Sequence, residues 1–351
     1  MKMKCFLHIG TEKTATTTLQ VFCAKNRGKL YELGYFYPKS VGDIDHRKLP
    51  VIAYNLNRRD DFTKKNLITT DELLAKYQKK VFNELRKEID NIKDNKKIIF
   101  SSEDIQSRLT TITEVKRLRD IFYSLGITDI TVVVYLRTPV DIVSSLYSTA
   151  VKVGSTAEKP PPPSDPYFRN ICHHKNTLER FESVFGKENI VPKIFSRKEF
   201  KNGSIIDDFL EIIGVQDSDQ FDIPKPTNKS LSPLGIELLR RINKRIPVFI
   251  NNQPNKLRGD LVLYFELYFE RFLGGKKYMM PKDLYEQYVL YFEDSNEWVR
   301  RNYFPNRPIL FEKRTNIKES KVIIPQFLLD LMAFIISKIW MYKRYKELDK
   351  S

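Results

Sequence analysis

An apolar run near the start of the chain leads directly into a loop of small and hydroxyl-bearing residues. The loop reads Gly10-Thr11-Glu12-Lys13-Thr14-Ala15-Thr16-Thr17-Thr18, and a helix-compatible stretch follows from Leu19. Where a strand passes through such a loop into a helix, backbone N–H groups and the helix dipole converge on one point. The sequence therefore predicts an anion site, with Lys13 as its cation and the threonine hydroxyls as further donors.

The spacing of this loop differs from that of nucleotide kinases, G-x-x-x-x-G-K-[ST]. Counted from Gly10, the kinase pattern requires a glycine at Ala15 and a lysine at Thr16. Such enzymes also use a carboxylate at a strand end to hold Mg²⁺, whereas the strongest predicted strand here ends in Leu136-Arg137. We predict no metal site, and a P-loop kinase-like phosphotransferase remains the alternative enzyme class.

A second anion-binding pattern begins at Arg137, directly after the apolar run Ile130–Leu136. The forked guanidinium of an arginine at a strand end can clamp a phosphate. Pro139 suits the first turn of a following helix, and Ser145 comes eight residues after the arginine. Two anion-binding patterns, each between a strand and a helix, are predicted to hold one polyanionic ligand.

The segment from His8 to Gln20 resembles the 5′-phosphosulfate loop of PAPS-dependent sulfotransferases, H-I-G-x-x-K-T-G-T-[ST]-[ST]-L-Q. These enzymes move a sulfuryl group from 3′-phosphoadenosine-5′-phosphosulfate (PAPS) to an acceptor. Arg137, Pro139 and Ser145 resemble the 3′-phosphate site of the same family, R-x-P followed by a serine. The resemblance covers roughly residues 4–312 and is greatest to bacterial-type, carbohydrate-sulfating members.

The resemblance implies a role for each of these residues. Lys13 would contact the oxygen that bridges phosphate and sulfate, while Thr16, Thr17 and the loop amides would hold the 5′-phosphate. Arg137 and Ser145 would hold the 3′-phosphate. The implied donor is PAPS, the product is 3′,5′-diphosphoadenosine, and the acceptor is a hydroxyl or amine of a carbohydrate or glycolipid. The family has glycine where this chain has Ala15, so the backbone is expected to manage there without a positive φ.

A candidate general base follows the predicted strand Ile98–Phe100, in the sequence Ser101-Ser102-Glu103. Many bacterial-type sulfotransferases have a similar Ser-Ser-Glu, which by resemblance makes Glu103 the base that accepts the acceptor's proton. The sequence also allows a structural role, in which Glu103 stabilises a first helical turn that Ser101 or Ser102 caps.

His8 is the rival candidate for the general base. A histidine inside an apolar strand is, however, more often a hydrogen-bonded core residue than a catalytic one. The other histidines, His46, His173 and His174, lie in polar surroundings of the sequence and belong to no motif.

The elements that must position these residues alternate along the chain. Amphipathic stretches follow each of the strand-like runs Cys5–Ile9, Ile98–Phe100, Ile130–Leu136 and Ile190–Phe195. This order predicts an α/β fold of three layers with a central parallel sheet, and the resemblance implies the P-loop NTPase-like fold of sulfotransferases. Ile130–Leu136 is predicted to be a central strand, buried on both faces, with ligands at its carboxyl end.

The part of the chain from Leu231 onward is predicted to be mostly helical. Ser232-Pro233 is typical of a helix start, and Asn228 to Ser230 either close over the nucleotide or form the turn before that helix. Earlier, Lys159–Pro166 contains four consecutive prolines and is predicted to be a surface loop. That loop is either a lid over the acceptor or a simple connector.

Composition limits the function classes. The 351 residues include 60 Lys and Arg against 44 Asp and Glu, a net charge of +16 that attracts anions. The basic residues are dispersed and no nucleic-acid-binding motif occurs, so we expect no nucleic-acid partner. Cys5, Cys23 and Cys172 are odd in number and lack metal or disulfide spacing, which favours a reducing, cytoplasmic location.

Residues 313–351 are predicted to form an amphipathic helical tail beyond a sulfotransferase domain of residues 1–312. Charges within the tail argue against a membrane span. Docking on the anionic inner face of a membrane would bring the enzyme to a lipid-linked saccharide, and packing against the enzyme's own core is the alternative. The predicted apolar stripe comprises Phe327, Leu328, Leu331, Phe334, Ile335, Ile339 and Tyr342, and the basic residues at or beyond its end are Lys338, Lys343, Arg344 and Lys346.

Overall fold

The computed structural model describes residues 3–92, 96–216, 218–225, 230–251, 253–271, 277–314 and 322–349. It divides into two compact units. The first, here called the sheet unit, comprises Met1–Thr138, Arg169–Pro226 and Asp294–Phe311. The second, the helical unit, comprises Pro139–Phe168, Thr227–Glu293 and Glu312–Ser351. The division at residue 312 into domain and tail remains a prediction, and Asn228 and Lys229 lie outside the described residues.

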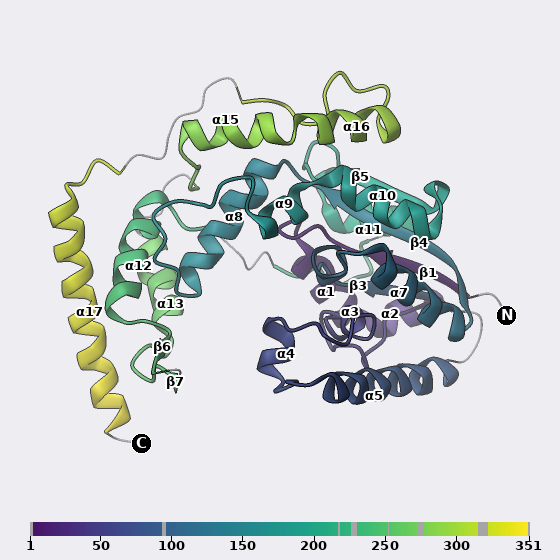
Figure 1. The fold of residues 1–351 in the computed structure, drawn as a ribbon, viewed down its shortest axis with the longest axis horizontal. Coiled ribbons are helices and arrows are strands. Elements are labelled where there is room, and N and C mark those ends of the chain that lie inside the picture. The colour runs from purple at the N-terminus through teal and green to yellow at the C-terminus, as the bar shows by residue number, and fades with distance from the viewer. Residues whose placement is uncertain are drawn as a thin grey trace. The chain divides into compact units, whose positions relative to one another are not determined.

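The sheet unit is built on a five-stranded parallel sheet in the order β2-β3-β1-β4-β5 (Figure 1). The strands are β1 (Met3–His8), β2 (Tyr35–Phe36), β3 (Lys97–Ser101), β4 (Ile127–Leu136) and β5 (Ile190–Ile194). All four predicted strands are confirmed, whereas the two residues of β2 were not predicted. β4 is an interior strand, but the central position belongs to β1, which pairs with both β3 and β4.

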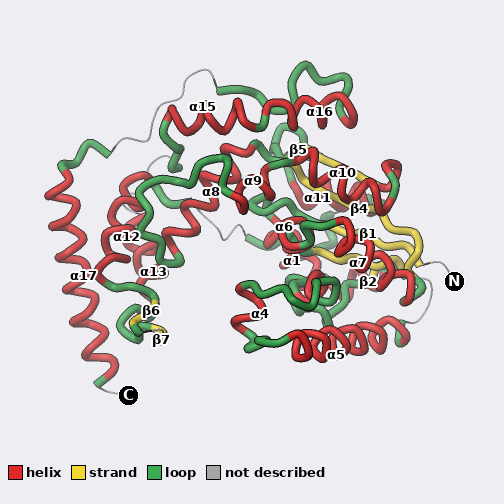
Figure 2. Tube along the Cα trace, in the orientation of Figure 1, coloured by secondary structure: helices red, strands yellow, loops and turns green. Residues whose placement is uncertain are grey.

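Helices cover both faces of this sheet, as Figure 2 shows in red around the yellow strands. The helices of the sheet unit are α1 (Thr16–Lys25), α2 (Arg27–Glu32), α3 (Lys48–Val51), α4 (Asp61–Lys65), α5 (Asp71–Asp90), α6 (Asp104–Arg108), α7 (Ile112–Ser124), α10 (His174–Phe185), α11 (Ile205–Ile213) and α16 (Glu293–Tyr303), with short turns η1 (Lys187–Asn189) and η2 (Lys201–Gly203). α9 (Pro166–Cys172) crosses from the helical unit into the sheet unit.

Alternate strand residues supply the two cores of the sheet unit, because successive side chains of a strand point to opposite faces. On β4, Val132 and Val134 pack into a core with α5, α7 and α10, while Val133 and Tyr135 pack into another with α1 and α11. Burying each aliphatic side chain contributes about 1.5–3 kcal/mol. The predicted three-layer α/β fold with a central parallel sheet is therefore confirmed.

The strand order brings three loops together. His8 is in register with Ser101 of β3 on one side and with Val133 of β4 on the other. The segments that follow β1, β3 and β4 therefore leave the same edge of the sheet as neighbours. From β1 the chain continues to β2 and β3 on one side of the sheet and then to β4 on the other. Open α/β sheets bind ligands at such a reversal of strand order.

The helical unit has its own apolar core. Its elements are α8 (Pro139–Lys152), α12 (Pro233–Arg245), β6 (Phe249–Ile250), β7 (Gln253–Pro254), α13 (Leu261–Tyr264), η3 (Phe265–Glu270), α15 (Lys282–Tyr291) and α17 (Gln326–Leu348). α12 begins as predicted, with the Ser232 side chain accepting a hydrogen bond from the Gly235 N–H and Pro233 at the first helical position. The prediction of a mostly helical C-terminal part is confirmed.

Two predictions for the helical unit need correction. The proline-rich segment has no regular structure, as predicted, but Pro160 and Pro163 are buried, so it is more than a solvated surface loop. The C-terminal helix α17 packs on α12 through a face that includes Leu329 and Ala333, and not through the predicted stripe. Across the part of the chain that the structure describes, no helix combines the length and apolarity needed to cross a membrane.

Candidate active site

The loop after β1 is fastened to the end of β4. The Thr11 N–H donates to the Tyr135 carbonyl at 3.1 Å, and the Tyr135 N–H donates to the Gly10 carbonyl at 2.7 Å. Thr11 Oγ1 also donates to the Tyr135 carbonyl, and Thr14 Oγ1 donates to the Thr11 carbonyl at 2.5 Å. The parallel pairing of β1 and β4 thus extends into the loop and gives it a defined course.

Gly10 is required at the base of this loop for two reasons. Its φ of +103° is disfavoured for residues with a side chain. A Cβ on Gly10 would also lie 3.1 Å from both Cα and Cβ of Glu103, closer than such atoms normally approach. The glycine therefore lets the predicted phosphate loop and the predicted base lie against each other.

The first turn of α1 has its N–H groups at the end of this loop. Its N-terminal residue Ala15 supplies no side-chain cap, whereas Thr70, Thr111 and Ser204 cap α5, α7 and α11 in the same unit. Backbone N–H groups in a first helical turn that no cap occupies can bind an anion.

The expected conformation of Ala15 is wrong. Its φ is +56° and its ψ is 29°, so the backbone adopts the left-handed conformation although glycine is absent. Lys13 has a similar φ of +65°. The path of the loop into the helix therefore imposes this conformation on Ala15. The clash of its Cβ with the backbone costs about 1–2 kcal/mol.

We expect Ala15→Gly to raise the free energy of unfolding by about 0.5–1 kcal/mol, because relief of the left-handed strain exceeds the added flexibility of the unfolded chain. Urea unfolding of both proteins measures the change. Ala75→Gly within the 20-residue helix α5 is the control, since it should lower stability by roughly 0.5–1 kcal/mol. If Ala15→Gly lowered the free energy of unfolding as much as the control does, Ala15 would not be strained.

Arg137 reaches back from the end of β4 to the loop. Its Nη1 donates to the Lys13 carbonyl at 2.6 Å, and its guanidinium lies 5.3 Å from the centre of the Phe195 ring. The Arg137 carbonyl accepts a hydrogen bond from His174 Nε2 at 2.7 Å. The two predicted cationic residues are thus neighbours, and Arg137 braces the loop that carries Lys13, a contact that the sequence did not indicate.

Glu103 follows β3 and lies beside the start of the phosphate loop. Its Oε2 accepts a hydrogen bond from Gln20 Nε2 at 2.7 Å. Gln20 is buried on α1, so this helix orients the carboxylate as well as presenting its N–H groups to the loop. Glu103 is also the N-cap residue of α6, as the structural alternative expects, but no side chain caps this helix and Ser101 Oγ is instead 2.7 Å from His8 Nδ1. The role of Glu103 as the base stays a prediction.

Gln20 is the residue whose contribution the sequence did not indicate. It belongs to the quoted motif, yet its partner Glu103 is far away in the sequence. Only the pairing of β1 with β3 brings the two side chains together, so local pattern could not have revealed the contact.

Two of the histidines differ from their predicted environments, whereas His8 is a core residue as expected. His8 is fully buried between the rings of Tyr135 and Phe209, and this burial lowers its pKa to about 3. His46 and His174 were expected in polar surroundings but are fully buried. Burial lowers their pKa values to about 3 and about 4, respectively. All three are therefore neutral core residues near neutral pH, and His8 has the structural role that its strand position favoured.

His46 and His8 hold the turn that precedes Glu103. His46 Nδ1 accepts a hydrogen bond from the Ser101 N–H at 3.1 Å, and His46 Nε2 donates to the Pro38 carbonyl at 2.9 Å. The Ser102 N–H donates to the His8 carbonyl at 3.0 Å. These buried contacts fix the backbone from which the Glu103 side chain extends.

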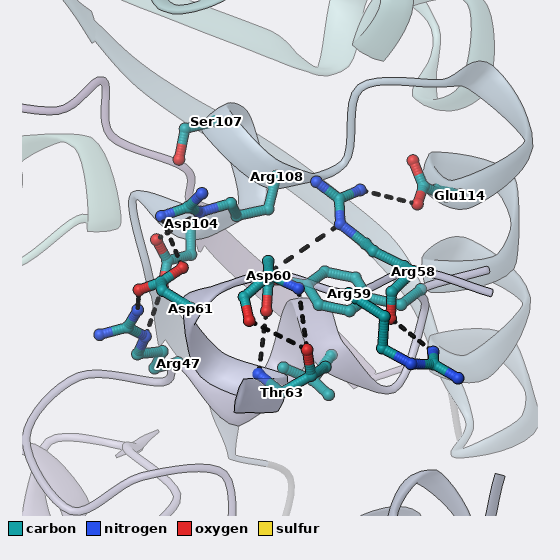
Figure 3. Close-up of polar contacts among 12 residues, drawn as sticks. Arg47, Arg58, Arg59, Asp60, Asp61, Thr63, Asp104, Ser107, Arg108 and Glu114 are labelled. Atoms are coloured by element: carbon teal, nitrogen blue, oxygen red, sulfur yellow. Dashed lines mark hydrogen bonds and ion pairs between the residues drawn. The ribbon is translucent and has the colours of Figure 1, made fainter. Parts of the chain in front are cut away.

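An ion-pair cluster anchors the chain directly after Glu103 (Figure 3). Asp104 lies 3.0 Å from Arg47 Nε and 3.6 Å from Arg108 Nε, and Asp61 pairs with the same two arginines. Burial raises the pKa of Asp104 to about 6 despite these cations. Residues just before α3, at the start of α4 and along α6 thus meet at one place, which holds the start of α6 against the rest of the sheet unit.

The predicted site residues fall into two groups. Gly10, the loop up to Thr18, Glu103 and Arg137 belong to the sheet unit and lie at the carboxyl edge of β3, β1 and β4. Ser145 lies on α8 in the helical unit, where its carbonyl accepts a hydrogen bond from Thr149 Oγ1. The predicted pairing of Arg137 with Ser145 around one phosphate therefore stays a prediction.

Similarity to other proteins is limited. No protein-family model matches the chain. An uncharacterized protein of Archaeoglobus fulgidus is 28% identical over 152 residues, which are 42% of this chain and 41% of that protein, so the match spans less than half of the relative. A crystal structure of a sulfotransferase from Alicyclobacillus acidocaldarius is 15% identical, with a TM-score of 0.38 over 65% of this chain and 87% of that one. Similarity this low carries no functional weight, and function rests on the residues of the site.

Proposed function

We propose that this protein is a sulfotransferase that moves a sulfuryl group from PAPS to a hydroxyl or amine of an acceptor, with a carbohydrate or glycolipid as the acceptor class. One observation carries the proposal: the loop of Lys13, the guanidinium of Arg137 and the carboxylate of Glu103 adjoin at one edge of the sheet. Two cations, an uncapped helix start and a carboxylate suit transfer from an anionic donor to a neutral, proton-bearing acceptor.

The donor would bind through its 5′-phosphosulfate at the loop. The N–H groups of Thr16 and Thr17 at the start of α1 would bind this anion, since those of Thr18 and Leu19 donate to the Ala15 carbonyl, and the helix dipole adds positive potential there. Lys13 would lie against the oxygen that links phosphorus to sulfur. Arg137 would supply the charge and the forked donors for the 3′-phosphate, the group that distinguishes PAPS from ATP.

The reaction balances without any further reactant. The acceptor oxygen or nitrogen forms a bond to sulfur while the bond from sulfur to the bridging oxygen breaks, and the electron pair leaves with 3′,5′-diphosphoadenosine. Glu103 would take the proton of the acceptor, and Lys13 would neutralise the charge that develops on the leaving oxygen. By analogy with phosphoryl transfer, the main contributions are positioning and electrostatic stabilisation.

Glu103, and not His8, is the general base in this proposal. The Glu103 side chain is partly exposed and is oriented by Gln20, whereas His8 is sealed between two aromatic rings. A base must come within about 2.6–3.2 Å of the proton that it takes, directly or through one water. A side chain with no solvent exposure cannot meet an acceptor in this way.

We expect Arg137→Ala to weaken the binding of 3′,5′-diphosphoadenosine by about ten- to a hundredfold, because a charge-assisted contact contributes roughly 1.5–3 kcal/mol. Binding of 5′-AMP, which lacks the 3′-phosphate, should change much less. Isothermal titration of both nucleotides against both proteins measures the difference. Titration with ATP and Mg²⁺ under the same conditions tests the kinase alternative, which requires tighter binding of ATP than of the diphosphate.

The matched control is Arg119→Ala, an arginine on α7 whose partner is the neighbouring Asp120. This variant should bind both nucleotides like the wild type. If Arg137→Ala weakened the binding of both nucleotides equally, Arg137 would not bind the 3′-phosphate. Its role would then be limited to the hydrogen bond with the Lys13 carbonyl.

A further inference from the structure

The C-terminal helix α17 is apolar on two opposite sides. Leu329, Ala333, Ser337 and Trp340 are buried and recur every three or four residues, so they form one helical face, which packs on α12. Leu331 and Ile335 each follow one of these residues by two positions, a rotation of about 200° around the helix. The second apolar side therefore lies directly opposite the packed one. It comprises Phe327, Leu328, Leu331, Phe334, Ile335, Ile339, Tyr342 and Tyr345, here called the outer stripe.

The outer stripe is exposed along the length of the helix. Phe327 is 69% exposed, Ile339 66% and Tyr342 63%. Such exposure is ordinary for a single apolar residue, but a contiguous apolar patch of this extent marks an interaction surface. The side of α17 that packs against the protein's own core is the one opposite the outer stripe. Packing within the protein therefore does not explain why the stripe is apolar.

Aromatic residues of α13 and η3 lie near the C-terminal half of α17. The ring of Tyr264 is 5.3 Å from that of Trp340 and 5.7 Å from that of Tyr268. Tyr264 and Tyr268 are exposed, as are Leu263 and Leu267. Because Trp340 belongs to the packed face of α17, these aromatic residues adjoin that face and are not part of the outer stripe.

The charges of α17 are divided between its sides. Lys338 and Lys346 lie among the residues of the outer stripe, and their ammonium groups are 5.6 Å from the Phe334 ring and 4.6 Å from the Tyr342 ring. The two carboxylates within Gln326–Leu348 bind arginines instead, Asp330 to Arg241 at 2.9 Å and Glu347 to Arg344. The outer stripe thus combines apolar side chains with cations and has no carboxylate of its own.

We propose that the outer stripe of α17 docks in the plane of an anionic lipid bilayer. Its apolar side chains would enter the boundary between headgroups and acyl chains, while Lys338 and Lys346 extend along neighbouring rings to reach anionic headgroups. A second copy of the chain fits this surface less well. A two-fold contact sets a surface against itself, which would bring the lysines of both copies into one contact with no carboxylate of either stripe to pair them.

Flotation of the full-length protein with liposomes tests this docking, which does not depend on the proposed transfer activity. We expect the protein to float with vesicles of phosphatidylcholine and phosphatidylglycerol but not with phosphatidylcholine alone. High salt should weaken the binding because it screens the lysines. The double variants Ile335→Ser/Ile339→Ser and Lys338→Glu/Lys346→Glu should each lose about tenfold or more in partitioning.

The matched controls lie on helices of the sheet unit. Ile112→Ser/Tyr123→Ser alters two exposed apolar residues of α7, and Lys79→Glu/Lys80→Glu alters two lysines of α5. Both controls should float like the wild type, and thermal unfolding checks that every variant is folded. The proposal is overturned if the wild type fails to float, if the stripe variants float as well as the controls, or if the wild type is a dimer that Ile335→Ser/Ile339→Ser converts to a monomer.

Discussion

Replacing Lys13 with alanine is expected to lower turnover by about a hundred- to a thousandfold, because its ammonium group would stabilise charge that appears on the leaving oxygen only during transfer. The substitution is selective. Arg137 binds the Lys13 carbonyl, which alanine retains, so the contact that braces the loop persists. Release of 3′,5′-diphosphoadenosine from PAPS, measured with a panel of saccharide acceptors, reports the rate.

Lys25→Ala, at the C-terminal end of α1, is the control and should turn over like the wild type. Unfolding in urea should be unchanged for both variants. If Lys13→Ala retains turnover within a few-fold of the wild type, Lys13 does not act in the transition state and the proposed mechanism loses its main cation.

Glu103→Gln is expected to lower turnover by about a hundred- to ten-thousandfold, the range that a positioned general base contributes. Glutamine has nearly the same shape, and a side-chain oxygen can still accept a hydrogen bond from Gln20. Donor affinity, titrated with 3′,5′-diphosphoadenosine, should therefore remain close to that of the wild type. The same release assay measures the rate.

Glu84→Gln on α5 is the control, since this carboxylate pairs only with the exposed Lys80 among the contacts described for it. Turnover of Glu103→Gln near the wild-type rate would exclude Glu103 as the base. If His8→Gln then lost activity while remaining folded, the base would be His8, contrary to its burial between Tyr135 and Phe209.

Local pattern was sufficient to predict four of the five strands of the sheet and the position of the loop after the first of them. Runs such as Ile130–Leu136 are rich in β-branched and apolar residues, a composition that favours a strand buried on both faces wherever it lies in the sheet. Gly10 and the threonines after it form a strand-to-helix turn whose N–H groups are determined by neighbours in the sequence. The α/β fold class was therefore predictable, and the anion site at this loop stays a prediction.

The order of strands was not predictable in the same way. Ile130–Leu136 is more apolar than Cys5–Ile9, yet β1 occupies the centre. All interior strands are buried on both faces. Composition can therefore distinguish an interior strand from an edge strand, but it cannot tell which interior strand is central. The contacts of Gln20 with Glu103 and of Arg137 with the Lys13 carbonyl depend on that order.

The C-terminal helix shows the same limit most clearly. Its sequence has apolar residues on both sides, and helical spacing alone identified one stripe, from Phe327 to Tyr342, without determining which side would pack. The structure buries Leu329, Ala333 and Trp340, because small and medium side chains at Ala333 and Ser337 let α17 approach α12 closely. By itself the sequence determined that α17 is helical and apolar, since both properties follow from residues within a few positions of each other. Tertiary packing decided which apolar side faces solvent, since that choice depends on the shape of a partner helix that is distant in the sequence.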